Sequence, residues 1–244
     1  MTKTLSFVAI CLLALGVIGC DPKTADNSAS NSTLKPVSTE GNNSETSEPV
    51  QDPGLDLAKI PAELKGDAFE YYGLGRTDPI KMKVVRGADS QDATQTVKLT
   101  KVEKDYAEFT ITSDGALAEL GEVVVRLDKA GIKVVSVKGT PADPDTFELP
   151  NGLSKGKSWP FKLPNEQQKI SGTNKVGGTE KVKTAVGTYE DALVVVMTGT
   201  GVQAGQKTQL QSKQWLVKGR GQVKAEITNV AGKAKQTITM EETK

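Results

Sequence analysis

The stretch Ile80-Lys-Met-Lys-Val84 contains the pattern that decides the fold. Apolar side chains alternate strictly with lysines, so in an extended chain the two kinds of side chain point to opposite faces. A strand of this kind has one buried face and one solvated face, which is typical of an antiparallel sheet. The sequence therefore predicts a β-strand here, with its lysines in water.

The same alternation recurs along the chain from about residue 67 onward. It is found in four further segments, Thr96–Thr100, Ala107–Ile111, Glu122–Leu127 and Val223–Thr228. Leu193–Met197 is apolar on both faces and is therefore predicted to be a central strand. Glycine accepts positive φ without steric cost, which suits it to the turns between strands. Such turns are predicted at Asp114-Gly115, Lys129–Gly131, Gly177-Gly178, Gly219–Gly221 and Ala231-Gly232.

These patterns predict an all-β fold of about eleven or twelve strands. Consecutive strands are expected to pair in up-and-down antiparallel order, forming either a curved sheet or a partly open barrel. Helix is predicted only as a turn or two within Leu55–Lys65, interrupted by Pro61, and as one turn at Ala116–Leu120.

The clearest internal break is the proline-rich segment Pro141–Pro150. Residues 55–244 are expected to form one β-rich domain, or two similar halves at residues 67–140 and 151–244. A strand, turn and strand pattern at Val123–Val137 has a counterpart at Gln214–Thr228, which is the observation behind the two-half alternative.

The first twenty residues have the layout of an export signal. Lys3 precedes the apolar run Leu5–Ile18, which is shorter than the roughly 20 residues that a transmembrane helix needs. The run ends at Val17-Ile18-Gly19-Cys20, which resembles the lipobox of bacterial lipoproteins. The resemblance implies cleavage after Gly19, removal of residues 1–19 as the signal peptide, and acylation of the Cys20 thiol.

Fatty acyl chains on Cys20 would tether the protein to membrane lipid, since two chains already give stable anchoring. Residues 20–54 are rich in Ser, Thr, Asn, Glu and Pro, so they are predicted to be a lipidated, disordered linker. A flexible linker of this length averages roughly 30–35 Å end to end. The expected location is the cell envelope, facing the periplasm or the cell exterior, and the sequence leaves inner and outer membrane open.

Histidine is absent from the 244-residue chain, and there are two cysteines, of which Cys11 lies in the predicted signal. The mature chain then has Cys20 as its only thiol. This excludes disulfides within the mature chain, zinc sites built on His or Cys, and Ser-His-Asp or Cys-His catalysis. No metal or other cofactor is predicted. The protein is not expected to be an enzyme.

The charge is close to balanced, with a formal net charge of +1. Lysines and arginines are spread along the predicted strands and form no dense basic block, so no nucleic-acid partner is predicted. The expected partners are membrane lipid, through Cys20, and either an unidentified envelope protein or an apolar ligand.

Three motifs occur in order in the C-terminal half: Gly156-Lys-Ser-Trp159, Thr184–Ala192 leading into Leu193–Met197, and Trp215–Lys224. Across residues 153–242 this order resembles the TapB-like family of bacterial secreted β domains. Val186 departs from the Ala-Gly-Thr-aromatic turn of that family, because it separates Ala185 from Gly187. The resemblance implies a curved antiparallel sheet and an envelope location, and it implies no catalytic residue.

Five side chains are candidates for a ligand groove: Tyr71, Tyr72, Arg76, Trp159 and Trp215. The aromatic cluster Phe69–Arg76 could line a groove, with Arg76 receiving an anion. The favoured alternative is that this cluster starts the first strand and plugs an end of the sheet. The two tryptophans could present their rings to a sugar or a lipid, or they could belong to the core.

Three functional hypotheses remain. The leading one is a non-catalytic binding or structural module of the envelope. The second is a carrier that buries a lipid or acyl chain against a curved sheet, and an apolar cavity would favour it. The third is a glycan hydrolase, which needs two carboxyl groups about 5–10 Å apart in a cleft.

Overall fold

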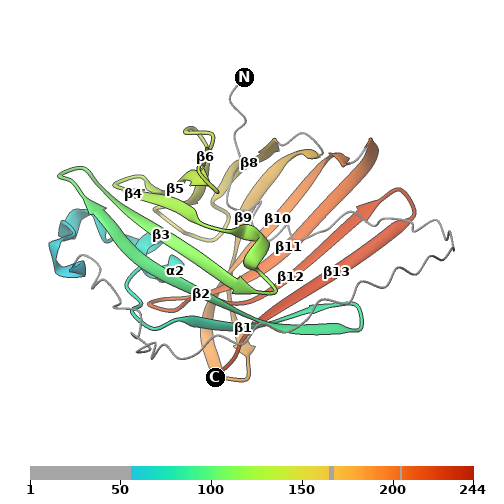
Figure 1. The fold of residues 1–244 in the computed structure, drawn as a ribbon, viewed down its shortest axis with the longest axis horizontal. Coiled ribbons are helices and arrows are strands. Elements are labelled where there is room, and N and C mark those ends of the chain that lie inside the picture. The colour runs from blue at the N-terminus through green and yellow to red at the C-terminus, as the bar shows by residue number, and fades with distance from the viewer. Residues whose placement is uncertain (1–55, 165–167, 204) are drawn as a thin grey trace, which may run out of the picture. The chain divides into compact units, whose positions relative to one another are not determined.

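The alternating segments become strands of one large antiparallel sheet (Figure 1). This computed structural model describes residues 56–164, 168–203 and 205–244. The predicted signal, the lipidation site at Cys20 and the linker up to residue 54 lie outside the described residues. Within the described part, the sheet has thirteen strands and is not closed into a barrel. The predicted all-β class is therefore confirmed, as one large antiparallel sheet that is not closed into a barrel.

The described strands in chain order are β1 (Ile80–Arg86), β2 (Asp89–Val102), β3 (Tyr106–Gly115), β4 (Val123–Asp128), β5 (Gly131–Val137), β6 (Thr140–Pro141), β7 (Phe147–Pro150), β8 (Ser158–Pro164), β9 (Gln168–Lys183), β10 (Thr188–Gln203), β11 (Gln206–Val217), β12 (Gly221–Ala231) and β13 (Ala234–Glu242). In β1, Ile80, Met82 and Val84 are buried while Lys81 and Lys83 are exposed. The alternation in the sequence thus predicts the two faces of this strand correctly.

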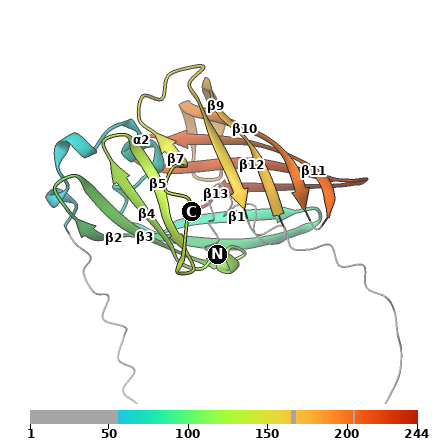
Figure 2. The same cartoon turned by 90° about the horizontal axis from the view of Figure 1, so that it is seen from above.

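The sheet consists of two meanders joined along the β1–β13 pair (Figures 1 and 2). Strands β1 to β6 follow one another on one side of that pair, and β8 to β13 follow one another on the other side. The predicted break at Pro141–Pro150 is where the chain passes from one edge of the sheet to the other. β7 lies in this passage, pairs with β5 and contacts β8.

The aromatic cluster near residue 70 begins with a helix. α2 (Asp67–Tyr72) occupies the place where the first strand was expected to start, so that prediction is wrong. The helix ends at Gly73, whose φ of +76° is the left-handed conformation that glycine adopts most readily. A Cβ at Gly73 would lie 2.7 Å from the backbone of Arg220, so the close approach of α2 to the β11–β12 turn also requires glycine.

Short 3-10 turns occupy both segments in which helical turns were predicted, η2 (Leu57–Lys59), η3 (Ala62–Leu64) and η4 (Ala118–Leu120). No helix among the described residues is long and apolar enough to cross a membrane.

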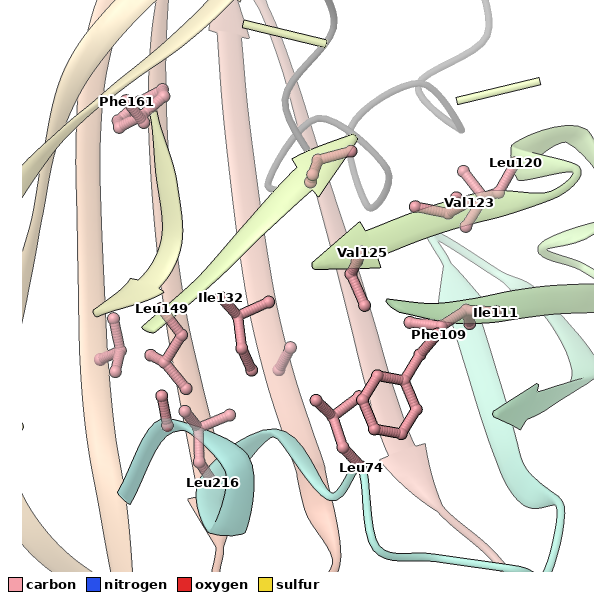
Figure 3. Packing of buried hydrophobic residues seen from close by; sticks show 14 of the residues in the cluster. Leu74, Phe109, Ile111, Leu120, Val123, Val125, Ile132, Leu149, Phe161 and Leu216 are labelled. Atoms are coloured by element: carbon pink, nitrogen blue, oxygen red, sulfur yellow. The ribbon is translucent and has the colours of Figure 1, made fainter. Parts of the chain in front are cut away.

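One continuous apolar core joins the two meanders and α2. Phe109 of β3, Val125 of β4 and Ile132 of β5 are fully buried and lie on the same side of the sheet as Leu149 and Leu216 (Figure 3). These residues come from alternate positions of their strands, as expected for a sheet with one buried face.

A glycine row lets an aromatic ring lie directly on the sheet. Phe161 of β8 stands opposite Gly172 of β9, which in turn stands opposite Gly199 of β10. A Cβ on Gly172 or Gly199 would lie 2.7 Å or 2.5 Å from the Phe161 ring. The missing side chains therefore leave the space in which the buried Phe161 ring packs.

Candidate functional site

The buried face of the sheet lines a partly open cavity of about 80 Å³, called here the inner cavity. Its wall draws on α2 and on strands of both meanders. Nine apolar side chains contribute to it: Ile80, Met82, Val97, Ile111, Leu117, Leu149, Val195, Leu216 and Met240. The wall is completed by Tyr71, Tyr72, Gln95, Glu148, Trp159, Asn174, Gln214 and Gln222.

This volume holds a small ligand. At roughly 10–15 Å³ for each water-sized group, the inner cavity has room for roughly five to eight such groups. Sites for drug-sized ligands are larger, about 300–1,000 Å³. The inner cavity therefore suits one short apolar chain or ring.

Trp159 and Asn174 supply polar groups in the wall. The two residues stand directly opposite each other on β8 and β9, so their side chains share the inner face. They are 5% and 2% exposed, and neither Trp159 Nε1 nor Asn174 Nδ2 has a hydrogen-bond partner among the described residues. Buried N–H groups are nearly always hydrogen-bonded, because leaving one unsatisfied costs about 1–3 kcal/mol. Two such donors side by side in an apolar wall indicate a place for an acceptor atom.

Among the described residues, the wall carries a single charged residue, Glu148, and no lysine or arginine. A hydrolase that uses two carboxylates would need a second acid at this site. The inner cavity thus gives the hydrolase hypothesis no support. No group of three or more His, Cys, Asp or Glu residues in the described part could hold a metal ion.

Three of the five predicted groove residues, Tyr71, Tyr72 and Trp159, line the inner cavity together. They come from α2 and β8, which are far apart in the sequence. Arg76 and Trp215 lie elsewhere, in two separate clusters.

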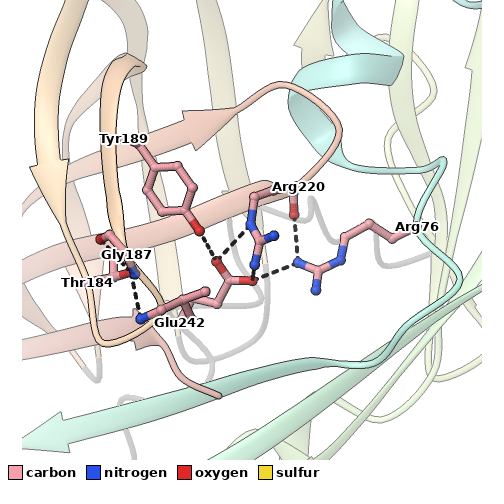
Figure 4. Close-up of polar contacts among 7 residues, drawn as sticks. Arg76, Thr184, Gly187, Tyr189, Arg220 and Glu242 are labelled. Atoms are coloured by element: carbon pink, nitrogen blue, oxygen red, sulfur yellow. Dashed lines mark hydrogen bonds and ion pairs between the residues drawn. The ribbon is translucent and has the colours of Figure 1, made fainter.

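Arg76 binds an anionic group that belongs to the chain itself. The Glu242 carboxylate, 2% exposed, accepts hydrogen bonds from Arg76 Nη1 at 2.9 Å and from Arg220 Nη2 at 2.7 Å (Figure 4). The hydroxyl of Tyr189 donates to the same carboxylate at 3.0 Å. This cluster ties the segment before β1, the β11–β12 turn and β10 to the end of β13. We interpret it as a structural clamp.

The clamp changes the acidity of its members. Burial raises the pKa of the Glu242 carboxyl, but the hydrogen bonds from Arg220 and Arg76 outweigh burial and hold that pKa below its usual value. Burial and the neighbouring Glu242 carboxylate raise the pKa of the Tyr189 hydroxyl. At neutral pH the clamp therefore contains an ionised carboxylate, two guanidinium groups and a neutral phenol.

Trp215 belongs to a second, smaller apolar cluster with Val182, Ala192, Val194 and Val223. It lies between Gln214 and Leu216, which line the inner cavity, so its ring is on the opposite face of β11. Its Nε1 donates to Glu180 at 3.3 Å, and the ammonium groups of two lysines lie over the ring. The indole of Trp215 is thus satisfied, in contrast to that of Trp159.

Asn174 was not among the residues that the sequence predicted for a groove. Ile170, Asn174 and Val176 are spaced by even numbers, so they share one face of β9 and are all buried. A polar residue on an otherwise apolar face was the available signal. The glycines at positions 172, 177 and 178 obscure the alternation that would have shown it.

No family model and no curated protein sequence matches this chain. The TapB-like resemblance therefore stays a prediction. Two solved structures are similar in fold. One is a presumed exported protein with a YmcC-like fold from Bacteroides fragilis, at 14% identity and a TM-score of 0.43, covering 68% of this chain and 94% of the other. The second is a presumed lipoprotein from Parabacteroides distasonis, at 11% identity and a TM-score of 0.44, covering 71% and 97%. Neither similarity is strong enough to assign a function.

Proposed function

We propose that this protein is a lipid-anchored, non-catalytic binding protein of the bacterial cell envelope, and that its β body holds a small apolar ligand in the inner cavity. The observation that carries the binding function is the pair of buried donors, Trp159 Nε1 and Asn174 Nδ2, beside nine apolar side chains in the wall of the inner cavity. Anchoring rests on the sequence at Cys20.

The cavity supports binding better than a purely structural role. A core that serves stability alone is packed to the density of an organic crystal, with few voids larger than a water molecule. A void of about 80 Å³ forfeits packing energy, and two unsatisfied donors beside it add a further cost. Both costs are offset when a ligand fills the space and accepts the hydrogen bonds.

The linker explains how such a body would meet its ligand. If residues 20–54 form the flexible linker that the sequence predicts, averaging roughly 30–35 Å, the β body would move near the membrane surface while Cys20 stays in the lipid. Apolar molecules are concentrated at that surface, so a tethered body would sample them repeatedly.

Native mass spectrometry of the protein purified from its own envelope tests the proposal. We expect a species heavier than the acylated chain by the mass of one small molecule, which is lost on denaturation. The Val97→Phe variant fills the cavity wall and should remove the added mass. The same substitution at the exposed Val202 is the matched control and should keep it. Finding only the unliganded acylated chain would contradict the proposal.

A further inference from the structure

The polar end of the inner cavity specifies what kind of atom the ligand presents. The donors Trp159 Nε1 and Asn174 Nδ2 are both uncharged N–H groups, and they project from directly opposed residues of β8 and β9. Directly opposed residues have Cβ atoms about 4.5–5.5 Å apart. Two donors at this spacing can converge on one oxygen, and a carbonyl oxygen has two lone pairs to accept them.

The charge of the wall disfavours an anionic oxygen, because the described lining has an acid and no cation. An ionised carboxylate or phosphate taken out of water needs a cation or several strong donors to compensate its lost hydration. The inner cavity has no lysine or arginine in its wall, and the one charged residue there is the acid Glu148. Three arginines lie within four positions of a cavity residue in the sequence. Arg76 and Arg220 are bound to Glu242, and Arg86 Nη2 donates to the Ala116 carbonyl at 3.1 Å.

We infer that the inner cavity selects a short apolar chain bearing a neutral carbonyl, an ester or an amide, whose oxygen accepts hydrogen bonds from Trp159 Nε1 and Asn174 Nδ2. This inference rests on the proposed function and names its ligand class. The chain lies against Val97, Val195 and Met240, and the carbonyl lies at the β8–β9 pair.

Four small probes test the inference: methyl hexanoate, N-methylhexanamide and hexanoate, which share one acyl chain, and the smaller benzene. The protein is the chain from Asp21 onward, which lacks the predicted signal and Cys20, and it carries Trp215→Phe. Trp159 is then the only tryptophan, and its emission reports directly on the wall of the inner cavity. Each probe is titrated at pH 7.5, and hexanoic acid is titrated again at pH 5.

At pH 7.5 the ester or the amide should bind at least about tenfold more tightly than hexanoate, because the anion loses its hydration without compensation. Whichever neutral probe binds more tightly identifies the source of the carbonyl. The affinity for hexanoic acid should rise toward pH 5, as its carboxyl group, with a pKa near 4–5, becomes partly neutral. The affinity for the ester should not change with pH.

Asn174→Leu removes one donor and keeps the branched shape of the side chain. It should lower the affinity for the ester by about three- to tenfold, the usual effect of one hydrogen bond. The affinity for benzene should stay the same or rise. The inference is overturned if hexanoate binds as tightly as the ester at pH 7.5. It is also overturned if Asn174→Leu leaves the affinity for the ester unchanged. Binding of benzene would keep the proposed function in either case. If none of the four probes changes Trp159 emission, the proposed function fails and the inference falls with it.

Discussion

Trp159 and Asn174 stand directly opposite each other on neighbouring strands, and each buries an N–H group that has no partner among the described residues. A pair of this kind is unfavourable in an empty protein and useful in a protein that binds a carbonyl. The relationship predicts that stability and binding oppose each other at these two positions.

Asn174→Leu should therefore stabilise the ligand-free protein. The substitution removes an unsatisfied buried donor and adds apolar surface, so the free energy of unfolding should rise by about 1–2 kcal/mol. Urea denaturation of the ligand-free protein measures this change. A loss of more than about 1 kcal/mol would show that Asn174 makes a favourable interaction in the empty protein, against our interpretation.

Glu242→Gln should destabilise the protein at neutral pH. The substitution leaves Arg76 and Arg220 without their carboxylate, and breaking a buried ion pair in this way costs about 2–4 kcal/mol, with the partial exposure of Arg220 reducing the cost. Chemical denaturation at pH 7 of the wild-type and variant proteins gives the difference. Equal stability of the two would rule out the clamp.

The same carboxylate predicts a pH dependence with a definite sign. The pKa of Glu242 is lower in the folded protein than in the unfolded chain, so its contribution is present above the unfolded value of about 4.3. The contribution is lost as the pH falls through the lower, folded value. The stability difference between wild type and Glu242→Gln should thus shrink below about pH 4. A difference that stays constant from pH 7 to pH 3 would contradict this assignment.

Gly199→Ala should cost about 1–3 kcal/mol, the usual range for overpacking, because the new Cβ would lie 2.5 Å from the Phe161 ring. Gly187→Ala is the matched control, since a Cβ there meets nothing within 4 Å. In a Phe161→Leu background the cost of Gly199→Ala should fall, and a double-mutant cycle measures this coupling. Purely additive effects would mean that the ring does not require the glycine.

Cys20→Ala tests the anchor. The variant lacks the thiol that the lipobox resemblance implicates in acylation, so it should not incorporate radioactive fatty acid in cells. It should accumulate as an uncleaved precursor or in soluble form. Normal labelling of the variant would refute the prediction of a lipoprotein.

Much of the fold follows from local chemistry that the sequence shows directly. The alternation at Ile80–Val84 predicts a strand, and glycines at the turns predict that consecutive strands pair in up-and-down order. Both features depend only on residues close together in the sequence. The helix at Asp67–Tyr72 was missed because its aromatic residues favour strands, while its capping glycine and the packing of α2 on the β11–β12 turn decide otherwise. The β1–β13 pairing joins residues more than 150 positions apart and leaves no local trace.

The site is less predictable than the fold. Tyr71, Tyr72 and Trp159 were proposed as separate aromatic candidates, and the sheet brings them to one cavity. The sequence could not distinguish Trp159 from Trp215, since both are tryptophans in strands. The face on which each ring lies depends on the register of β8 and β11, and in β11 a bulge at Trp215 changes the pairing with β12. The ion pair of Arg76 could not be predicted either, because its partner Glu242 is 166 positions away in the sequence.

The central claim is that the inner cavity binds one small apolar ligand, and a titration with single-tryptophan proteins tests it most directly. The Trp215→Phe protein keeps Trp159 in the cavity wall, and the Trp159→Phe protein keeps Trp215 on the opposite face. With benzene, which needs no hydrogen bond from Trp159, we predict a saturable change in emission for Trp159 and none for Trp215. Adding Val97→Phe to the first protein should abolish the change, and adding Val202→Phe should preserve it. Equal responses from both tryptophans, or a response that survives Val97→Phe, would contradict the account.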